Sequence, residues 1–168
     1  DADMVCQLAL ALQPAWAERS APTALVQALD QAIARRPAGQ ADQPQLHALA
    51  AQLALSAGER DIATRHAAQA ADAWPADRAL RAWAQVQVAK VRWRAQGDAD
   101  GARALLQQAV DTAQAAGDGA AEAAAHNQPA TLANEHDTDP AAAEAGYQRC
   151  SRFRRTPCGA CATTWPSR

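Results

Sequence analysis

Residues 58 to 75 read Gly58-Glu-Arg-Asp-Ile-Ala63-Thr-Arg-His-Ala67-Ala-Gln-Ala70-Ala-Asp-Ala-Trp-Pro75, and this stretch predicts the fold of the chain. Ala63, Ala67 and Ala70 are spaced i, i+4 and i+7, which places them on one face of a helix. Gly58 precedes the first of these alanines by five residues and Pro75 follows the third by five, and both residue types interrupt helices. We therefore expect one helix with a face of small residues, bounded by two breaks.

The same spacing recurs in three other segments of the chain. Small or apolar residues occupy the matching positions, and successive sets are offset by 38, 39 and 41 residues. The four sets are Leu25, Leu29, Ala32; Ala63, Ala67, Ala70; Ala102, Leu106, Ala109; and Ala143, Tyr147, Cys150. A recurrent period of this length is typical of stacked helical repeats.

Glycine, proline and aspartate breaks divide the chain into helical segments that fall into pairs. Helices are expected at residues 3–18, 22–36, 44–57, 60–74, 78–96, 99–116, 119–135 and 140–150. The paired helices give repeat units at about 3–37, 44–75, 78–116 and 119–150. Pro14 and Pro129 fall inside the first helices of the first and last units, so we expect these two helices to be kinked, short or differently placed.

Composition supports an all-α fold. Alanine accounts for 49 of the 168 residues, whereas valine, isoleucine, leucine and phenylalanine together account for 22. This balance favours closely packed helices and argues against a β-sandwich or a doubly wound sheet. A single hairpin cannot cover its own apolar face, so successive hairpins must stack. We predict an α-solenoid of about four antiparallel helix hairpins, with a plain antiparallel helical bundle as the alternative.

The units resemble the tetratricopeptide repeat (TPR) family. In residues 44–77, Gly58, the three alanines and Pro75 occupy the family's turn, packing and exit positions. The next unit matches through Gly97 and the set Ala102, Leu106, Ala109, with Trp93 at the large aromatic position. The spacing exceeds the family's usual repeat of roughly 34 residues. The chain is thus similar to the longer-helix variety found in helical regions of bacterial signalling and transcription regulators, which implies a right-handed superhelix.

The resemblance implies a protein–protein interaction scaffold that binds a peptide or a protein domain in its concave groove. The alternative is a regulatory or sensory segment of a larger bacterial transcriptional or signalling regulator whose effector domain is not in this chain. The lysine, arginine and asparagine set with which chaperone-binding TPRs hold a terminal carboxylate has no match here. Alignment to the repeat gives five candidate groove residues, which are Gln45, Gln52, Leu55, Gln85 and Arg94.

Enzymatic motifs are not found in the sequence. It contains no glycine-rich phosphate loop, no nucleophile elbow and no paired-histidine metal motif. The four histidines are scattered over separate expected helices, and Glu135-His136-Asp137 is typical of a solvated helix end. Short loops also leave little room for an active site. We therefore expect no enzymatic activity, no cofactor and no metal.

Charge is unevenly distributed along the chain. Residues 1–148 carry 11 basic and 18 acidic residues, whereas residues 149–168 carry five arginines and no acidic residue. An acidic body argues against nucleic acid as a partner. No run of 18 apolar residues occurs, and acidic residues flank the apolar N-terminal stretch, so we expect a cytoplasmic protein that does not bind membranes. An uncapped repeat end would favour self-association.

Residues 151–168 depart from the helical composition and are expected to be disordered. Cys150, Cys158 and Cys161 supply three thiols, fewer than the four ligands of a structural zinc site, so we expect unstructured thiols. GC-rich DNA read out of frame gives such a mixture of residues, which makes an out-of-frame tail our preferred explanation. Because the chain begins at Asp1, we also expect it to be a piece of a longer protein or a processed product.

One expected helix, residues 78–96, carries both aromatic and basic side chains. Trp83 and Trp93 lie ten residues apart, nearly three turns, and therefore share a face. Large aromatic rings in an alanine-rich stack fill gaps, so we expect core packing rather than partner binding. Lys90, Arg92 and Arg94 form a basic strip on the same helix, which we expect to be a solvated face.

Overall fold

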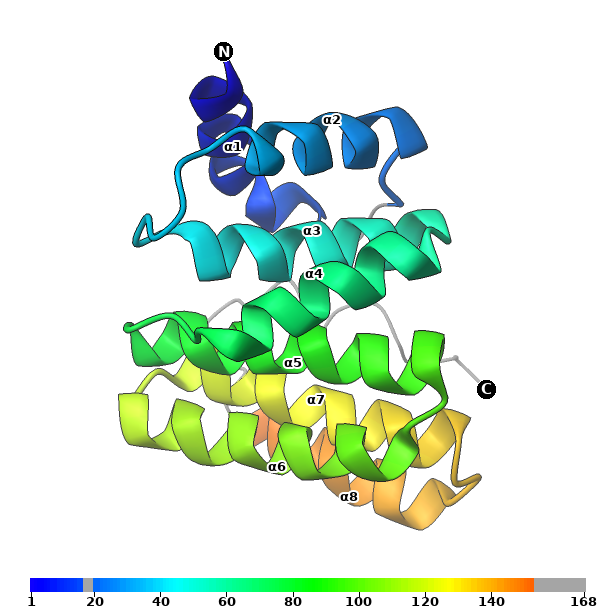
Figure 1. Ribbon diagram of the computed structural model, residues 1–168. Helices are drawn as coiled ribbons and strands as arrows, with labels where there is room; N and C mark the ends of the chain where they lie inside the picture. Colours follow the sequence, from blue (N-terminus) through cyan, green and yellow to red (C-terminus); the bar gives the residue numbers. More distant parts are fainter. Residues whose placement is uncertain (17–19, 153–168) are drawn as a thin grey trace.

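The computed structural model describes residues 1–16 and 20–152, and within these ranges the secondary structure is helical, without a strand (Figure 1). This confirms the prediction of an all-α fold. The expected disordered tail begins later than residue 151, because Ser151 and Arg152 belong to the last helix, and Cys150 is buried in that helix rather than an unstructured thiol. The expectations for residues 153–168, including the thiols of Cys158 and Cys161, lie outside the described residues. The elements are α1 (Ala2–Ala11), the 3-10 turn η1 (Gln13–Trp16), α2 (Thr23–Ala34), α3 (Gln43–Ala57), α4 (Arg60–Asp72), α5 (Arg78–Gln96), α6 (Ala99–Ala116), α7 (Gly119–Glu135) and α8 (Pro140–Arg152).

Glycine stops and aspartate caps set the boundaries of the central hairpins. Gly58 ends α3 at φ +82° and Gly97 ends α5 at φ +73°, in the left-handed region that glycine adopts without steric cost. The carboxylate of Asp77 accepts a hydrogen bond from the Leu80 N–H at 2.9 Å at the start of α5. The carboxylate of Asp98 does the same for α6, where it accepts from the Gly101 N–H at 2.8 Å. The predicted boundaries in this part of the chain are therefore accurate to within a few residues.

The stripe of small residues forms the buried face of the second helix in each pair. Ten of its twelve members are buried, and the exceptions, Leu25 and Tyr147, are partly exposed. Along α4, Ala63, Ala67 and Ala70 are each at most 2% exposed. Small side chains along one face allow a neighbouring helix to approach closely, which is how a chain with few large apolar residues builds its core.

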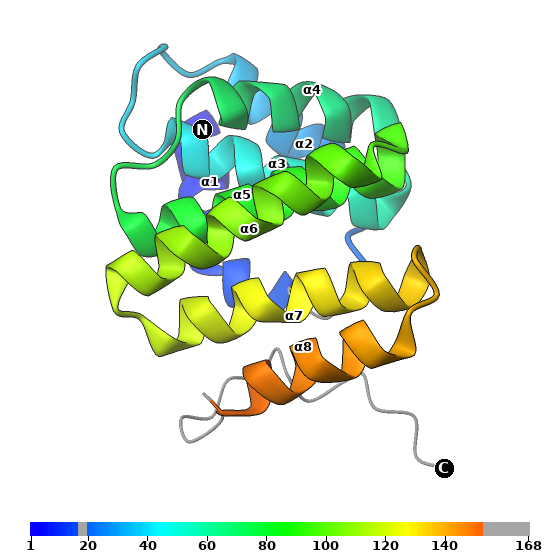
Figure 2. The ribbon, with the colours of Figure 1, turned by 90° about the horizontal axis from the view of Figure 1, so that it is seen from below.

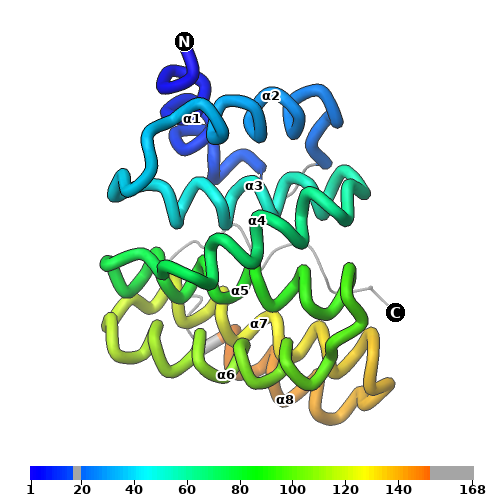
Figure 3. The backbone as a smooth tube through the Cα atoms, viewed as in Figure 1, coloured from blue at the N-terminus to red at the C-terminus, as the bar shows by residue number. Residues whose placement is uncertain are grey.

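Helices pack mainly against their neighbours in the chain. The closest associations are between α5 and α6, α3 and α4, and α7 and α8. On one side of the molecule the odd-numbered helices also meet, since α3 contacts α1 and α5, and α5 contacts α7. In Figure 1 the chain descends from α1 and α2 at the top to α8 at the bottom, and the tube in Figure 3 follows the same path. The odd-numbered helices therefore form a continuous row, called the odd-helix row below.

The first helix of the first unit is short, as Pro14 predicts. The helix expected at residues 3–18 ends at Ala11, and Pro14 lies in the 3-10 turn η1. A proline ring removes one backbone donor and clashes with the preceding turn, which explains the early end. Figures 1 and 3 show α1 steeply inclined to α2 rather than alongside it. The Arg36 guanidinium bonds to Asp3 at 2.8 Å and to Asp42 at 3.1 Å, and so joins α1 to the segment before α3.

The first helix of the last unit is not shortened. Pro129 lies inside α7, which runs from Gly119 to Glu135 without ending at the proline, so of the expected outcomes for this helix the shortening is wrong. α7 and α8 lie side by side in Figure 2. A Cβ atom at Gly146 of α8 would come within 2.6 Å of the Ala130 Cβ of α7. Small residues at this crossing therefore let the two helices approach more closely than most side chains permit.

The tryptophans of α5 pack as predicted. Trp83 and Trp93 are partly buried and lie against the core.

Among the helices of the described residues, none is both long and apolar enough to span a membrane.

Candidate functional site

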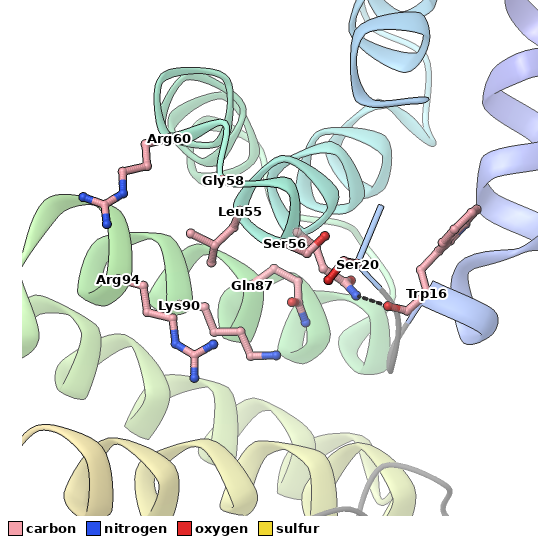
Figure 4. Close-up of a pocket in the computed structure, with 10 residues that line it drawn as sticks. Trp16, Ser20, Leu55, Ser56, Gly58, Arg60, Gln87, Lys90 and Arg94 are labelled. Carbon is pink, nitrogen blue, oxygen red and sulfur yellow. Dashed lines mark hydrogen bonds between the residues drawn. The ribbon is translucent and has the colours of Figure 1, made fainter. Parts of the chain in front are cut away.

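A polar cleft with a volume of about 550 Å³ lies on the odd-helix row, between α3 and α5 (Figure 4). Gln52 and Leu55 line it from the C-terminal half of α3, and Lys90 and Arg94 line it from α5. The start of α4 and the turn η1 complete its walls. The cleft is thus built from three successive units of the chain.

Three of the five predicted groove residues line this cleft. Gln52, Leu55 and Arg94 come together there from α3 and α5. Gln45 also lies on α3, but its amide donates a hydrogen bond to the Gln13 side chain of η1 at 2.9 Å. Gln85 is 5% exposed and lies on the buried side of α5.

Lys90, the only lysine of the chain, is partly buried in the cleft wall. Among the described residues no carboxylate forms an ion pair with its ammonium group. Burial, together with the positive charge of Arg94, lowers the pKa of Lys90 to about 8. The expectation of a solvated basic strip is therefore wrong for Lys90. Helical spacing alone does not reveal which turn of α5 faces a cleft.

The two arginines of the cleft are more exposed than Lys90. Arg94 forms an ion pair with Glu135 of α7 at 3.1 Å, and its guanidinium lies 4.8 Å from the centre of the Trp93 ring. Arg60 is exposed at the start of α4, and within the described part of the chain no acidic side chain pairs with it. The cleft therefore carries positive charge that nearby acidic residues compensate only in part.

Buried polar atoms at the cleft wall also lack partners. Within residues 1–16 and 20–152, Trp16 Nε1, Gln52 Oε1 and Gln87 Oε1 form no hydrogen bond. The amide nitrogen of Gln52 donates to the Trp16 carbonyl at 3.4 Å, and that of Gln87 donates to the Trp83 carbonyl at 3.5 Å. Both bonds are long and therefore weak. Most buried polar groups in proteins have partners, so these three atoms remain able to bond to a water molecule or a ligand.

A second polar cluster, called the histidine cluster below, joins α2, α3 and α4. The Nδ1 atoms of His47 and His66 are 2.9 Å apart, and His66 Nε2 lies 3.1 Å from the Asp30 carboxylate, which also accepts a hydrogen bond from Arg65 at 3.0 Å. A carboxylate can only accept, so His66 Nε2 carries the proton and donates to Asp30. His66 Nδ1 is then the acceptor for the Nδ1–H of His47.

Burial determines the charge of the histidine cluster. It lowers the pKa of His47, and it lowers the pKa of His66 to about 4, with the neighbouring His47 acting in the same direction. The hydrogen bond from Arg65 lowers the pKa of Asp30. At neutral pH the cluster therefore holds two neutral rings and one carboxylate, and both nitrogens of His66 are bonded. Residues 47 and 66 meet across a hairpin, and no local spacing in the sequence indicates this pairing.

Metal ligands do not gather anywhere in the described ranges, since no three histidine, cysteine, aspartate or glutamate side chains there are placed to hold one ion. At the end of α7, Glu135 pairs with Arg94, and Asp137 pairs with Arg103 at 2.9 Å. These acidic residues therefore join neighbouring helices.

Comparison with protein-family models finds no match for this chain, and comparison with curated proteins finds none either. The function is therefore inferred from the cleft and its surroundings.

Proposed function

We propose that this chain is a TPR-like protein-interaction scaffold, a right-handed α-solenoid that binds a peptide or a protein domain in its concave groove. The order of helix contacts supports the solenoid, because all extensive contacts join helices that are one or two places apart in the chain. A closed bundle would also bring distant helices together around one shared core.

The polar cleft on the odd-helix row is the observation that carries the proposal. It lies where α3 and α5, the first helices of consecutive units, meet, which is the surface that a repeat scaffold presents to its ligand. Leu55 offers apolar contact, and the amides of Gln52 and Gln87 offer hydrogen bonds. A peptide has an apolar side-chain surface and a backbone rich in donors and acceptors, so it suits these walls.

A displayed library of random peptides, selected against the chain, tests the proposal. The affinity of an enriched peptide is then measured by calorimetry for the wild type and for Leu55→Ala. We expect this variant to bind about tenfold more weakly, since loss of a central apolar contact costs about 1.4 kcal/mol.

Leu8→Ala is the matched control, because Leu8 is 58% exposed on α1 and does not line the cleft. Circular dichroism checks that both variants keep their helix content. The proposal is overturned if no peptide is enriched, or if the two leucine variants weaken binding equally.

A further inference from the structure

Lys90 contrasts with Arg36, a cation of low exposure that has two acidic partners. The Arg36 side chain is 9% exposed and bonds to both Asp3 and Asp42. The more exposed Arg65 and Arg103 also pair with carboxylates, on α2 and after α7. Lys90 is different, since it is partly buried and the described residues provide no carboxylate for it. A charge withdrawn from water without a counter-charge is costly, so this position favours a nearby anion.

The surroundings of Lys90 leave space for such an anion. Figure 4 shows Gln87, Lys90 and Arg94 extending from α5 into the same cleft, opposite Leu55 of α3. Arg94 shares its charge with Glu135, whereas Arg60 has no acidic partner in the described ranges. The lowered pKa of Lys90 is consistent with the missing counter-charge.

The side-chain amides of Gln52 and Gln87 indicate that the anionic group belongs to a molecule that also has N–H donors. Gln52 and Gln87 line the cleft, and the Oε1 atom of each has no donor among the described residues. A peptide supplies N–H donors beside an acidic side chain. An inorganic anion such as sulfate supplies no such donors.

We infer that the cleft recognises an acidic side chain of a bound peptide, whose carboxylate pairs with Lys90 while its backbone N–H groups donate to Gln52 and Gln87. This inference depends on the proposed peptide-binding function and adds the chemistry of the residue that is recognised. The interaction is a charge-assisted hydrogen bond in a partly desolvated cleft, where it is stronger than on an open surface.

The single lysine allows a direct test. Reductive methylation with ¹³C-formaldehyde places an NMR-visible group on Lys90, and Lys90→Arg identifies its resonance beside that of the α-amino group. The probe is an end-blocked peptide, acetyl-Ala-Glu-Glu-Leu-Ala-amide, and its control carries glutamine in place of both glutamates. We expect the acidic peptide to raise the pKa of Lys90 by about one unit, since a carboxylate within contact distance favours the charged form. The glutamine peptide is expected to leave it unchanged.

Affinity gives an independent measure. Lys90→Met is expected to reduce affinity for the acidic peptide about tenfold or more, to that of the glutamine peptide, whereas Lys90→Arg retains most of the affinity. Equal shifts with sodium sulfate would show a non-selective anion site and overturn the inference. A shift produced only by a glutamine peptide with a free C-terminus would assign the site to a terminal carboxylate and overturn it as well.

The two proposals fail in different ways. If library peptides bind and depend on Leu55 but not on Lys90, the acidic-residue inference is wrong and the scaffold function stands. If no peptide binds but free glutarate raises the pKa of Lys90, both proposals are wrong and the cleft is a site for small carboxylates.

Discussion

The histidine cluster and the Lys90 cleft both place basic side chains between neighbouring helices, but they differ in their partners. His66 has both ring nitrogens bonded, to His47 and to Asp30. Lys90 has no acidic partner among the described residues, and the amides beside it hold only long hydrogen bonds. Buried polar groups that are hydrogen-bonded to one another stabilise a fold. Polar groups beside a cavity that have no such partner are candidates for ligand binding.

Acid gives the largest expected effect, and it acts on the histidine cluster. The pKa of His66 is about 4 in the folded chain, below the 6.5 of a free histidine, so the unfolded chain binds more protons between these values. The contribution of His66 to the free energy of unfolding is therefore complete above pH 6.5 and is lost as the pH falls toward 4. For His66 alone this loss is about 3 kcal/mol. His47 acts in the same direction, and Asp30 extends the loss below its unfolded pKa.

Urea denaturation at half-unit steps from pH 7 to pH 4 measures this loss. The variant His47→Leu/His66→Leu serves as the control, and its stability should change far less over the same range. A wild-type free energy of unfolding that is constant from pH 7 to pH 4.5 would show that the histidines are not buried as neutral rings.

Replacing one histidine of the pair is expected to lower the free energy of unfolding by about 2 kcal/mol. In His66→Leu, the Nδ1–H of His47 loses its acceptor and Asp30 loses one of its two donors. Replacing both histidines with leucine removes the pair together and should recover much of the loss. A double-mutant cycle by urea denaturation at pH 7.5 measures the coupling. Additive losses would mean that the two rings do not interact.

A carboxylate introduced beside Lys90 should give this lysine a partner within the chain, as Asp30 is for His66. In Gln87→Glu the new carboxylate lies three residues before Lys90 on α5, within reach along the helix. We expect it to raise the pKa of Lys90 by about one unit and to weaken binding of the acidic peptide. The methyl resonance of Lys90 reports the first effect, and Gln108→Glu on the exposed face of α6 is the control. An unchanged pKa would show that the ammonium group of Lys90 does not lie near the side chain of residue 87.

The smallest expected effect is that of Lys90→Met on stability. Removing a lysine without an acidic partner takes away no ion pair, and methionine fits the same space, so the free energy of unfolding should change by less than about 1 kcal/mol. Thermal unfolding without ligand measures this change. A large loss would show that Lys90 holds the fold together, as His66 does, and would remove the contrast between the two regions.

Local signals predict much of the fold. Gly58 and Gly97 mark helix ends because few other residues adopt positive φ, and the alanine stripe identifies the buried face of α4. The effects of Pro14 and Pro129 could not be read in the same way. One proline lies in a turn and the other inside a helix, and the packing of neighbouring helices decides between these outcomes.

The candidate site was predictable only in part. Repeat alignment places Gln52, Leu55 and Arg94 on the odd-helix row, where they line the cleft. Gln87 and Lys90 carry no comparable signal, because the rotation of α5 against α3 decides which of its turns faces the cleft. The pairing of His47 with His66 depends on the register between α3 and α4, and a sequence does not specify that register at the level of single atoms.

The restriction of extensive helix contacts to near neighbours has a consequence for folding and local opening. Contacts that are short-range in sequence carry a small loop-closure cost, so helix hairpins of this kind form quickly. Opening can also begin at either end of the array without disrupting its centre. Amide hydrogen exchange should therefore be slowest in α3 to α6 and faster toward α1 and α8, so the cleft between α3 and α5 lies in the most persistent part of the molecule.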